Sequence, residues 1–221
     1  MDGNGRWARR RGLPRSAGHA AGSLTFREIS RYCNKIGIQV LTVYTLSTEN
    51  WSRPQQEIDG ILDLLRENLR DSKNFLHENI RVRFIGELSR FPQDIRELIA
   101  QAEEASAPAT GMTLNLAVNY GGQDEIVHAV RAAAADVAAG KLAPDTITAA
   151  DIEKHLYTAG QPPLDLIIRP SGELRLSNFL LWQSAYAELW FSDILWPSFK
   201  PRDLDAALEA FAVRHRRFGG V

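Results

Sequence analysis

Only one cysteine, Cys33, occurs among the 221 residues of this sequence. An internal disulfide is therefore excluded, which is typical of proteins from a reducing compartment. No run approaches the roughly 18 apolar residues of a membrane span, and the positive charges near the amino terminus lead into no apolar run of the signal-peptide kind. We expect Cys33 to be buried on a helix and the protein to be cytoplasmic.

An excess of charge of either sign is also missing. The chain carries 26 Lys and Arg against 27 Asp and Glu, a formal net charge of −1. This balance argues against general nucleic-acid binding, so any anion site must be local. With 44% hydrophobic and 24% charged residues, the chain is typical of an ordered globular protein, and its length favours one domain spanning residues 1–221.

Helical and extended patterns alternate along the chain. Strands separated by helices of ten or more residues predict an α/β fold, a single domain with a mainly parallel central sheet flanked by helices. Ligands of such sheets bind at the carboxyl ends of the strands. The expected strands cover 38–47, 80–86, 112–122 and 164–169, and the expected helices cover 16–35, 54–78, 92–105, 123–139 and 201–218.

The opening stretch, MDGNGRWARRRGLPRSAGH, gathers small and cationic residues. Gly3 and Gly5 let backbone N–H groups converge on an anion, and a following helix favours negative charge. Arg6, Arg15 and His19 could clamp phosphate oxygens, and Arg does so in a bidentate manner. Read alone, the same stretch is equally typical of a basic terminus with a chance Gly-Asn-Gly turn.

Asp2 does not suit a simple anion site, because a carboxylate repels a phosphate. Its presence is explained if a Mg²⁺ ion lies between the carboxylate and a diphosphate. A phosphate-binding loop usually follows a strand, yet this one begins at residue 1. We expect either that a first strand is missing from the sequence or that the helix behind the loop anchors it.

A second polar stretch, STENWSRPQQE (47–57), directly follows an expected buried strand. A strand-to-helix loop is where an α/β protein places its site. The structural alternative is a helix start that Ser52 caps and to which Glu57 reaches back, but it leaves Asn50 and Arg53 without a role. The site hypothesis instead makes Ser47, Asn50 and Arg53 hydrogen-bonding groups that face a ligand.

The stretch IIRPSGELRLSNF (167–179) follows another expected strand. Arg169 and Arg175 stand six residues apart, with Ser177 two further on. This arrangement suits a second diphosphate held by two guanidinium groups and a hydroxyl. Surface arginines paired with acids such as Glu173 are the alternative.

Glu188 stands within an otherwise apolar stretch, FLLWQSAYAELWF (179–191). A buried carboxylate is costly unless it is paired or bound to a metal. A salt bridge is the ordinary explanation. Because Asp2 also needs a cation, a Mg²⁺ ion shared by Asp2 and Glu188 is the competing hypothesis.

Together these motifs resemble the cis-prenyltransferases of the undecaprenyl diphosphate synthase family. The resemblance covers essentially the whole chain and implies a homodimeric α/β enzyme with a parallel sheet and an apolar tunnel, walled by the helices over 16–36 and 57–78. The implied reaction joins isopentenyl diphosphate to an allylic diphosphate and forms Z double bonds. The matching motifs are MDGNGRWA, RxxxGH at 15–19, LSTENWSRP, NYGG, RPSGELRLSNFLLWQSAYAELWF and RRFGG.

The resemblance also implies roles for individual residues. Asp2 would hold Mg²⁺, the implied cofactor, and help the allylic diphosphate to leave, while Glu188 would complete the ion's ligands. Ser47, Asn50 and Arg53 would lie near the reacting carbons and support positioning or proton transfer. By this resemblance Ser47 and Asn50 are catalytic together with Asp2, and Trp51 and Arg53 bind substrate.

Two sets of residues would hold the diphosphates, and the segment 217–219 could reach a neighbouring subunit's site. Plain helix termination explains that segment equally well. The set for the allylic diphosphate is Gly3, Asn4, Gly5, Arg6, Arg15 and His19, and the set for the homoallylic one is Arg169, Arg175 and Ser177.

Two positions depart from the family's pattern. Pro170 stands where Thr is common and removes a backbone donor beside the second diphosphate. Leu174 replaces a polar residue, so no metal role is assigned there. Because both lie in the homoallylic site, the alternative reaction couples two allylic diphosphates head-to-middle, with dimethylallyl diphosphate as acceptor, to lavandulyl-type products.

The expected partners are these diphosphates and a second copy of the chain. We expect no nucleic acid, and at most peripheral membrane contact through a lipid product. A non-catalytic partner subunit of the same fold is a further alternative, but it should lack the catalytic loop, whereas Asp2, Asn4 and Arg6 are all present.

Overall fold

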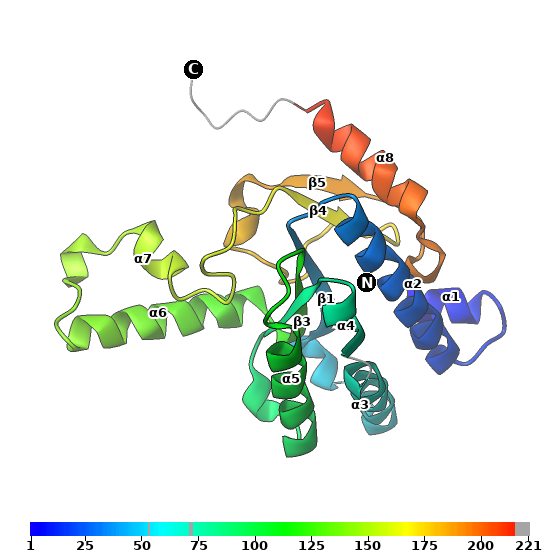
Figure 1. Ribbon diagram of the computed structural model, residues 1–221, viewed down its shortest axis with the longest axis horizontal. Helices are drawn as coiled ribbons and strands as arrows, with labels where there is room; N and C mark the ends of the chain where they lie inside the picture. Colours follow the sequence, from blue (N-terminus) through cyan, green and yellow to red (C-terminus); the bar gives the residue numbers. More distant parts are fainter. Residues whose placement is uncertain (53, 71–72, 215–221) are drawn as a thin grey trace.

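The computed structural model describes residues 1–52, 54–70 and 73–214 (Figure 1). Helices and parallel strands alternate along the chain, which confirms the α/β prediction. The elements are α1 (Asn4–Arg9), α2 (Arg15–Lys35), β1 (Val40–Ser47), α3 (Gln55–Arg70), α4 (Lys73–His77), β2 (Arg81–Ile85), α5 (Gln93–Ser106), β3 (Thr113–Tyr120), α6 (Gly122–Ala138), α7 (Ala149–Glu153), β4 (Leu166–Arg169), β5 (Glu188–Phe191) and α8 (Pro201–Ala212).

The strands lie in two parallel sheets rather than in the one central sheet that the sequence predicts. β1, β3 and β2 form the first in the order β1-β3-β2, and β4 and β5 form the second. A cavity of about 1760 Å³ is lined by β1 on one side and by β4 on the other. The strands of both sheets are parallel, so the polar loops that follow β1 and β4 lie at the carboxyl ends of strands.

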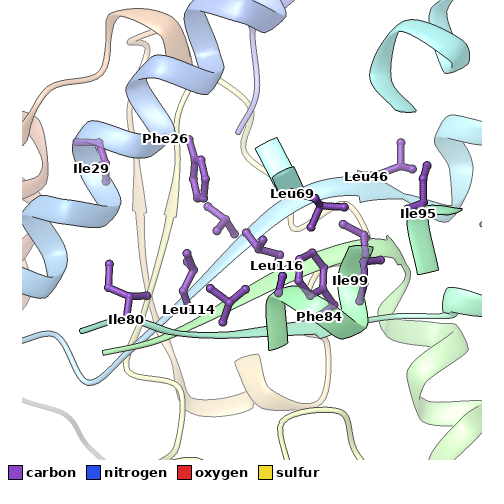
Figure 2. Packing of buried hydrophobic residues seen from close by; sticks show 14 of the residues in the cluster. Phe26, Ile29, Leu46, Leu69, Ile80, Phe84, Ile95, Ile99, Leu114 and Leu116 are labelled. Carbon is purple, nitrogen blue, oxygen red and sulfur yellow. The ribbon is translucent and has the colours of Figure 1, made fainter. Parts of the chain in front are cut away.

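The hydrophobic core packs around β3, the middle strand of the larger sheet. Leu114 and Val118 of this strand are fully buried, as expected for a strand with neighbours on both edges. Helices α2, α3 and α5 supply side chains to the same core, and Figure 2 shows Phe26 and Ile99 within it. β1 was expected to be buried on both faces, but only Val43 and Leu46 are, because the strand borders the cavity.

Several element boundaries differ from the prediction. The helix expected over 54–78 ends at Arg70, and α4 follows as a separate short helix. The last helix ends at Ala212, and the segment 217–219 lies outside the described residues. In Figure 1, α6 and α7 extend to one side, away from the two sheets. Cys33 is 2% exposed on α2, as predicted. Among the described helices, none is long and apolar enough to cross a membrane.

Candidate active site

The amino-terminal segment is anchored by close packing. The backbone of Gly3 has φ +91°, a left-handed value that favours glycine, and an added Cβ would lie 2.3 Å from Ser171 Oγ. Behind the segment, α1 lies so close to α2 that a Cβ on Gly18 would stand 2.1 Å from the Asn4 carbonyl oxygen. These contacts fix the segment against α2 and against the loop after β4.

Asp2 joins this segment to the loop after β4. Its carboxylate accepts hydrogen bonds from Arg169 Nη2 at 3.1 Å and from the Gly3 N–H at 2.6 Å. Its carbonyl oxygen accepts from Ser171 Oγ at 2.6 Å and from the Trp196 N–H at 3.0 Å. Two stretches more than 160 residues apart in sequence thus meet at one residue.

The ionisation of Asp2 follows from these contacts. Partial burial by itself raises the pKa of the carboxyl group. The hydrogen bonds from Arg169 and the Gly3 N–H, together with the charge of Arg169, outweigh burial and lower the pKa below its usual value of 3.8. Asp2 is therefore an ionised carboxylate at neutral pH, the state that a metal ligand requires.

Three arginines and two carboxylates form a ring, and Asp2 is one of the two carboxylates. Arg6 Nη2 lies 3.6 Å from Asp2 and 3.2 Å from Glu173, and Glu173 pairs with Arg175 at 2.5 Å. Arg169 Nη1 closes the ring by donating to the Arg175 carbonyl, and it also donates to Ser177 Oγ at 2.8 Å. The ring carries one more positive than negative charge, so it favours an anion.

The large cavity opens onto this ring. Its lining includes Asp2 and Arg175 and, at the carboxyl end of β1, Ser47 and Asn50. The Ser47 N–H donates to Asn50 Oδ1 at 3.4 Å, which orients the amide. The structure thus brings six predicted site residues to one cavity: Asp2, Ser47, Asn50, Arg169, Arg175 and Ser177.

Other predicted residues lie beside the ring rather than in the cavity lining. Arg15 packs over Gly5, where an added Cβ would meet its Nε at 3.0 Å, and it pairs with Glu57 at 3.0 Å. His19 follows one turn later on α2 and is half-buried. Arg53 lies outside the described residues.

The polar stretch after β1 makes contacts within the loop and with α2. Ser52 Oγ donates to the Glu49 carbonyl at 2.7 Å, and Glu57 pairs with Arg15 at 3.0 Å. Trp51 faces the core: its Nε1 donates to Asn119 at 2.7 Å, and its ring lies 5.6 Å from that of Phe91. The structure therefore shows a packing role for Trp51 and does not place its ring in the cavity lining.

Glu188 makes a salt bridge in the structure. It is the first residue of β5, where its backbone pairs with Leu166, and its carboxylate lies 2.8 Å from Arg214 Nη1. Arg169, which binds Asp2, lies three residues further along β4. Three residues of strand span about 10 Å. A salt bridge is the ordinary explanation that the sequence offers for Glu188, and a Mg²⁺ ion shared with Asp2 stays a prediction.

Sequence reasoning missed the residues that hold the loop after β4. Ser171 is 3% exposed with φ +84°, and the Asn178 side chain donates to Glu49 at 3.0 Å and accepts from the Gln123 N–H at 2.8 Å. Asn and Gly in SNF and PSG are turn formers that tolerate positive φ, which was the available signal. The partners of Asn178 come from the segment after β1 and from α6, which the local sequence does not reveal.

Comparison with known sequences gives a consistent result. The profile of a family described as "Putative undecaprenyl diphosphate synthase" matches residues 1–219. An isoprenyl transferase of Clostridium perfringens is 50% identical over 222 residues, which span 100% of this chain and 88% of that protein. An isoprenyl transferase of Brucella suis is 54% identical over 222 residues, spanning 100% of this chain and 87% of that protein.

Two solved structures have a similar fold. The lavandulyl diphosphate synthase from Lavandula x intermedia, solved in complex with dimethylallyl diphosphate, matches with a TM-score of 0.96 and 38% identity over 100% of this chain and 95% of that chain. A probable undecaprenyl diphosphate synthase from Campylobacter jejuni matches with a TM-score of 0.79 and 35% identity over 91% of this chain and 93% of that chain. The likeness thus extends over nearly the whole molecule.

Proposed function

The chain belongs to the undecaprenyl diphosphate synthase family and is a prenyltransferase, and from this premise we propose its reaction. It condenses an allylic diphosphate with isopentenyl diphosphate, depends on Mg²⁺ and forms Z double bonds. The observation that carries the proposal is the contact of Asp2 with Arg169 at the mouth of the large cavity.

The arginine ring provides the diphosphate sites. Arg6, with the backbone of Gly3 to Gly5, serves the allylic diphosphate, and Arg15 and His19 border the same side. Arg169, Arg175 and Ser177 serve the second diphosphate from the loop after β4. Guanidinium groups suit this task because their N–H groups match pairs of phosphate oxygens and stay charged at every relevant pH.

Asp2 is the residue of the ring that suits Mg²⁺. Within the described chain, no group of three or more His, Cys, Asp or Glu side chains could hold a metal alone. Mg²⁺ commonly uses one or two carboxylates together with substrate phosphates, so a single ionised carboxylate beside two diphosphate sites fits. When bound, the ion would neutralise the charge that develops on the leaving diphosphate.

Ser47 and Asn50 would face the reacting carbons. They lie at the carboxyl end of β1 and line the cavity together with Asp2 and Arg169. Their hydroxyl and amide groups would position the diphosphate-bearing carbons or support proton transfer, and Arg53, outside the described residues, is proposed to assist. Holding reactants in a defined geometry is a large part of such catalysis.

The hydrocarbon chain would extend between α2 and α3. The large cavity is less suited to an alkyl chain, because it borders edges of β1 and β4, which pair only with β3 and β5 in the described sheets. Backbone polar groups on such edges suit hydrogen-bonding partners better than alkyl chains. A second cavity of about 60 Å³ lies between the helices predicted as tunnel walls, lined by Leu65 and Leu69, and Phe26 borders both cavities.

A homodimer is part of the proposal. Val127 and Val130 support it, because they lie three residues apart on one face of α6 and are 46% and 51% exposed. Contiguous exposed apolar side chains mark interaction surfaces. Light scattering on the purified chain should give about twice the monomer mass of 24.7 kDa, and a monomeric mass would contradict this part.

A second reaction is supported by one observation. The structural match with the lavandulyl diphosphate synthase has a TM-score of 0.96, above that of the probable undecaprenyl diphosphate synthase at 0.79. The alternative is therefore head-to-middle coupling of two molecules of dimethylallyl diphosphate.

One experiment separates the two reactions. The protein is incubated with Mg²⁺ and dimethylallyl diphosphate alone, then with isopentenyl diphosphate added, and the dephosphorylated products are identified by mass spectrometry and NMR. The main proposal predicts Z-prenyl products only when isopentenyl diphosphate is present. Coupled product from dimethylallyl diphosphate alone would reject it in favour of the alternative, and no product in either incubation would reject both.

A further inference from the structure

Glu173 contacts one arginine of the amino-terminal segment and one arginine of its own loop. Its Oε1 lies 3.2 Å from Arg6 Nη2, and its Oε2 accepts from Arg175 Nη1 at 2.5 Å. We propose that Glu173 is a positioning residue that orients both arginines and so links the two diphosphate subsites. The inference rests on the proposed function, because it assigns the two arginines to different diphosphates.

The exposure of the three side chains shows why the arginines need support. The side chain of Arg175 is 63% exposed and that of Arg6 is 36% exposed, whereas Glu173 is 26% exposed. An exposed arginine loses rotamer entropy when a ligand orders it. A carboxylate that holds both arginines before the ligand arrives lowers this cost.

The donors of the two arginines show that Glu173 orients them without blocking them. A guanidinium group carries five N–H donors. Arg6 uses Nη1 for the Ser171 carbonyl at 2.9 Å and Nη2 for the acids, and Arg175 uses Nη1 for Glu173. Each group therefore keeps donors that a diphosphate can accept, so the carboxylate and the ligand do not exclude each other.

The other half of the ring does not depend on Glu173. Asp2 is held by Arg169, by the Gly3 N–H and through its carbonyl by Ser171. Removing the Glu173 carboxylate should therefore weaken binding at both subsites while leaving Asp2, the residue proposed to assist the leaving diphosphate, in place. The expected signature is a rise in KM for both substrates with a much smaller change in kcat.

The test compares Glu173→Gln with Asp136→Asn. An amide retains the size of the acid but can accept from only one arginine through its oxygen, so the bridge is lost. Asp136 is the matched control, because it also bridges two side chains, Lys141 at 3.3 Å and His155 at 2.9 Å, at 28% exposure near the far end of α6. Thermal unfolding monitored by circular dichroism confirms that both variants are folded.

Two measurements are made on each variant. Calorimetric titration with inorganic diphosphate should show about tenfold weaker binding for Glu173→Gln than for the parent chain, and no change for Asp136→Asn. Steady-state kinetics should show a KM increase of similar size for dimethylallyl diphosphate and for isopentenyl diphosphate. Glu173→Asp, which keeps the charge, should recover part of the affinity for diphosphate and part of the loss in KM.

The outcomes separate this inference from the proposed function. If the parent chain binds no inorganic diphosphate and forms no product, the proposed function fails. If the parent is active but Glu173→Gln matches it in affinity and in both KM values, Glu173 has no positioning role. Tighter binding by Glu173→Gln would also overturn the inference, because it would show that the carboxylate competes with the ligand.

Discussion

The two segments that meet at Asp2 are fixed in different ways. The amino-terminal segment is held by steric contact, with glycine backbones at distances that admit no side chain. The loop after β4 is held by polar contacts, and it places Ser171, Ser177 and Asn178 at positive φ values of 84°, 50° and 62°. Strained backbone of this kind persists only where the surroundings hold it in place.

The two segments should therefore be disrupted by different kinds of substitution. Added atoms should disrupt the first segment, because there is no space for them. Lost partners should disrupt the second, because its hydrogen bonds offset the cost of its backbone conformation. The two are joined by Asp2, which belongs to the first and is bound by Arg169 from the second.

The largest effect is expected when this junction is removed. Asp2→Ala leaves Arg169 without its carboxylate partner and removes the proposed ligand of Mg²⁺. We expect kcat to fall about 10³-fold, the upper range for loss of one electrostatic group in an active site, while circular dichroism shows a native fold. Asp145→Ala, at an exposed position, is the control, and near-normal turnover by Asp2→Ala would refute the metal role.

Arg169→Lys tests the polar segment. The guanidinium serves Asp2, Ser177 and a backbone carbonyl at once, and an ammonium cannot reproduce this planar geometry. We expect kcat/KM to fall about 10²-fold, or about 2.7 kcal/mol. Arg202→Lys, with 87% of the side chain exposed, should match the parent. Equal kcat/KM for Arg169→Lys would show that charge alone suffices at this position.

Gly18→Ala tests the packed segment. The added Cβ would meet the Asn4 carbonyl at 2.1 Å, so we expect a loss of about 2 kcal/mol in the free energy of unfolding. Gly60→Ala in α3 meets no atom within 4 Å and should stabilise by about 0.5–1 kcal/mol. Urea unfolding measures both, and equal effects of the two substitutions would refute the role assigned to close packing.

The smallest effect concerns the acid dependence of the loop after β4. Partial burial raises the pKa of Glu49, but hydrogen bonds from its own backbone N–H and from Asn178 outweigh it and lower the pKa below 4.5. A lowered pKa in the folded state contributes stability above about pH 4.5 that is lost as the pH falls through the folded value.

Glu49→Gln should remove this contribution. The free energies of unfolding of parent and variant should differ above about pH 4.5 and converge as the pH falls through the lowered pKa of Glu49 in the folded state. Urea unfolding between pH 3 and 7 measures this difference. A difference that stays constant across the range would mean that the ionisation of Glu49 does not stabilise the loop.

Local patterns were sufficient to predict the alternation of helices and parallel strands and the polar loops after β1 and β4. Asp2, Arg169 and Arg175 could be named because a carboxylate within a basic stretch and arginines after a buried strand are unusual. The division into two sheets was not predictable, because the edges of β1 and β4 are separated by a cavity that no local pattern encodes. The contacts of Trp51 with Asn119 and Phe91 could not be predicted, because an aromatic residue in a loop can face either a cavity or the core.

The sequence by itself determined the family, the α/β class and the residue types of the site, since these depend on motifs and on periodicity along the chain. Only the tertiary structure decided which residues meet. It brought Arg6 to Glu173, 167 residues away, and it placed Glu188 and Arg169 at opposite ends of a parallel strand pair. The physical reason is that ion pairs and steric contacts act over a few ångströms in space, whereas the residues that make them can be any number of positions apart along the chain.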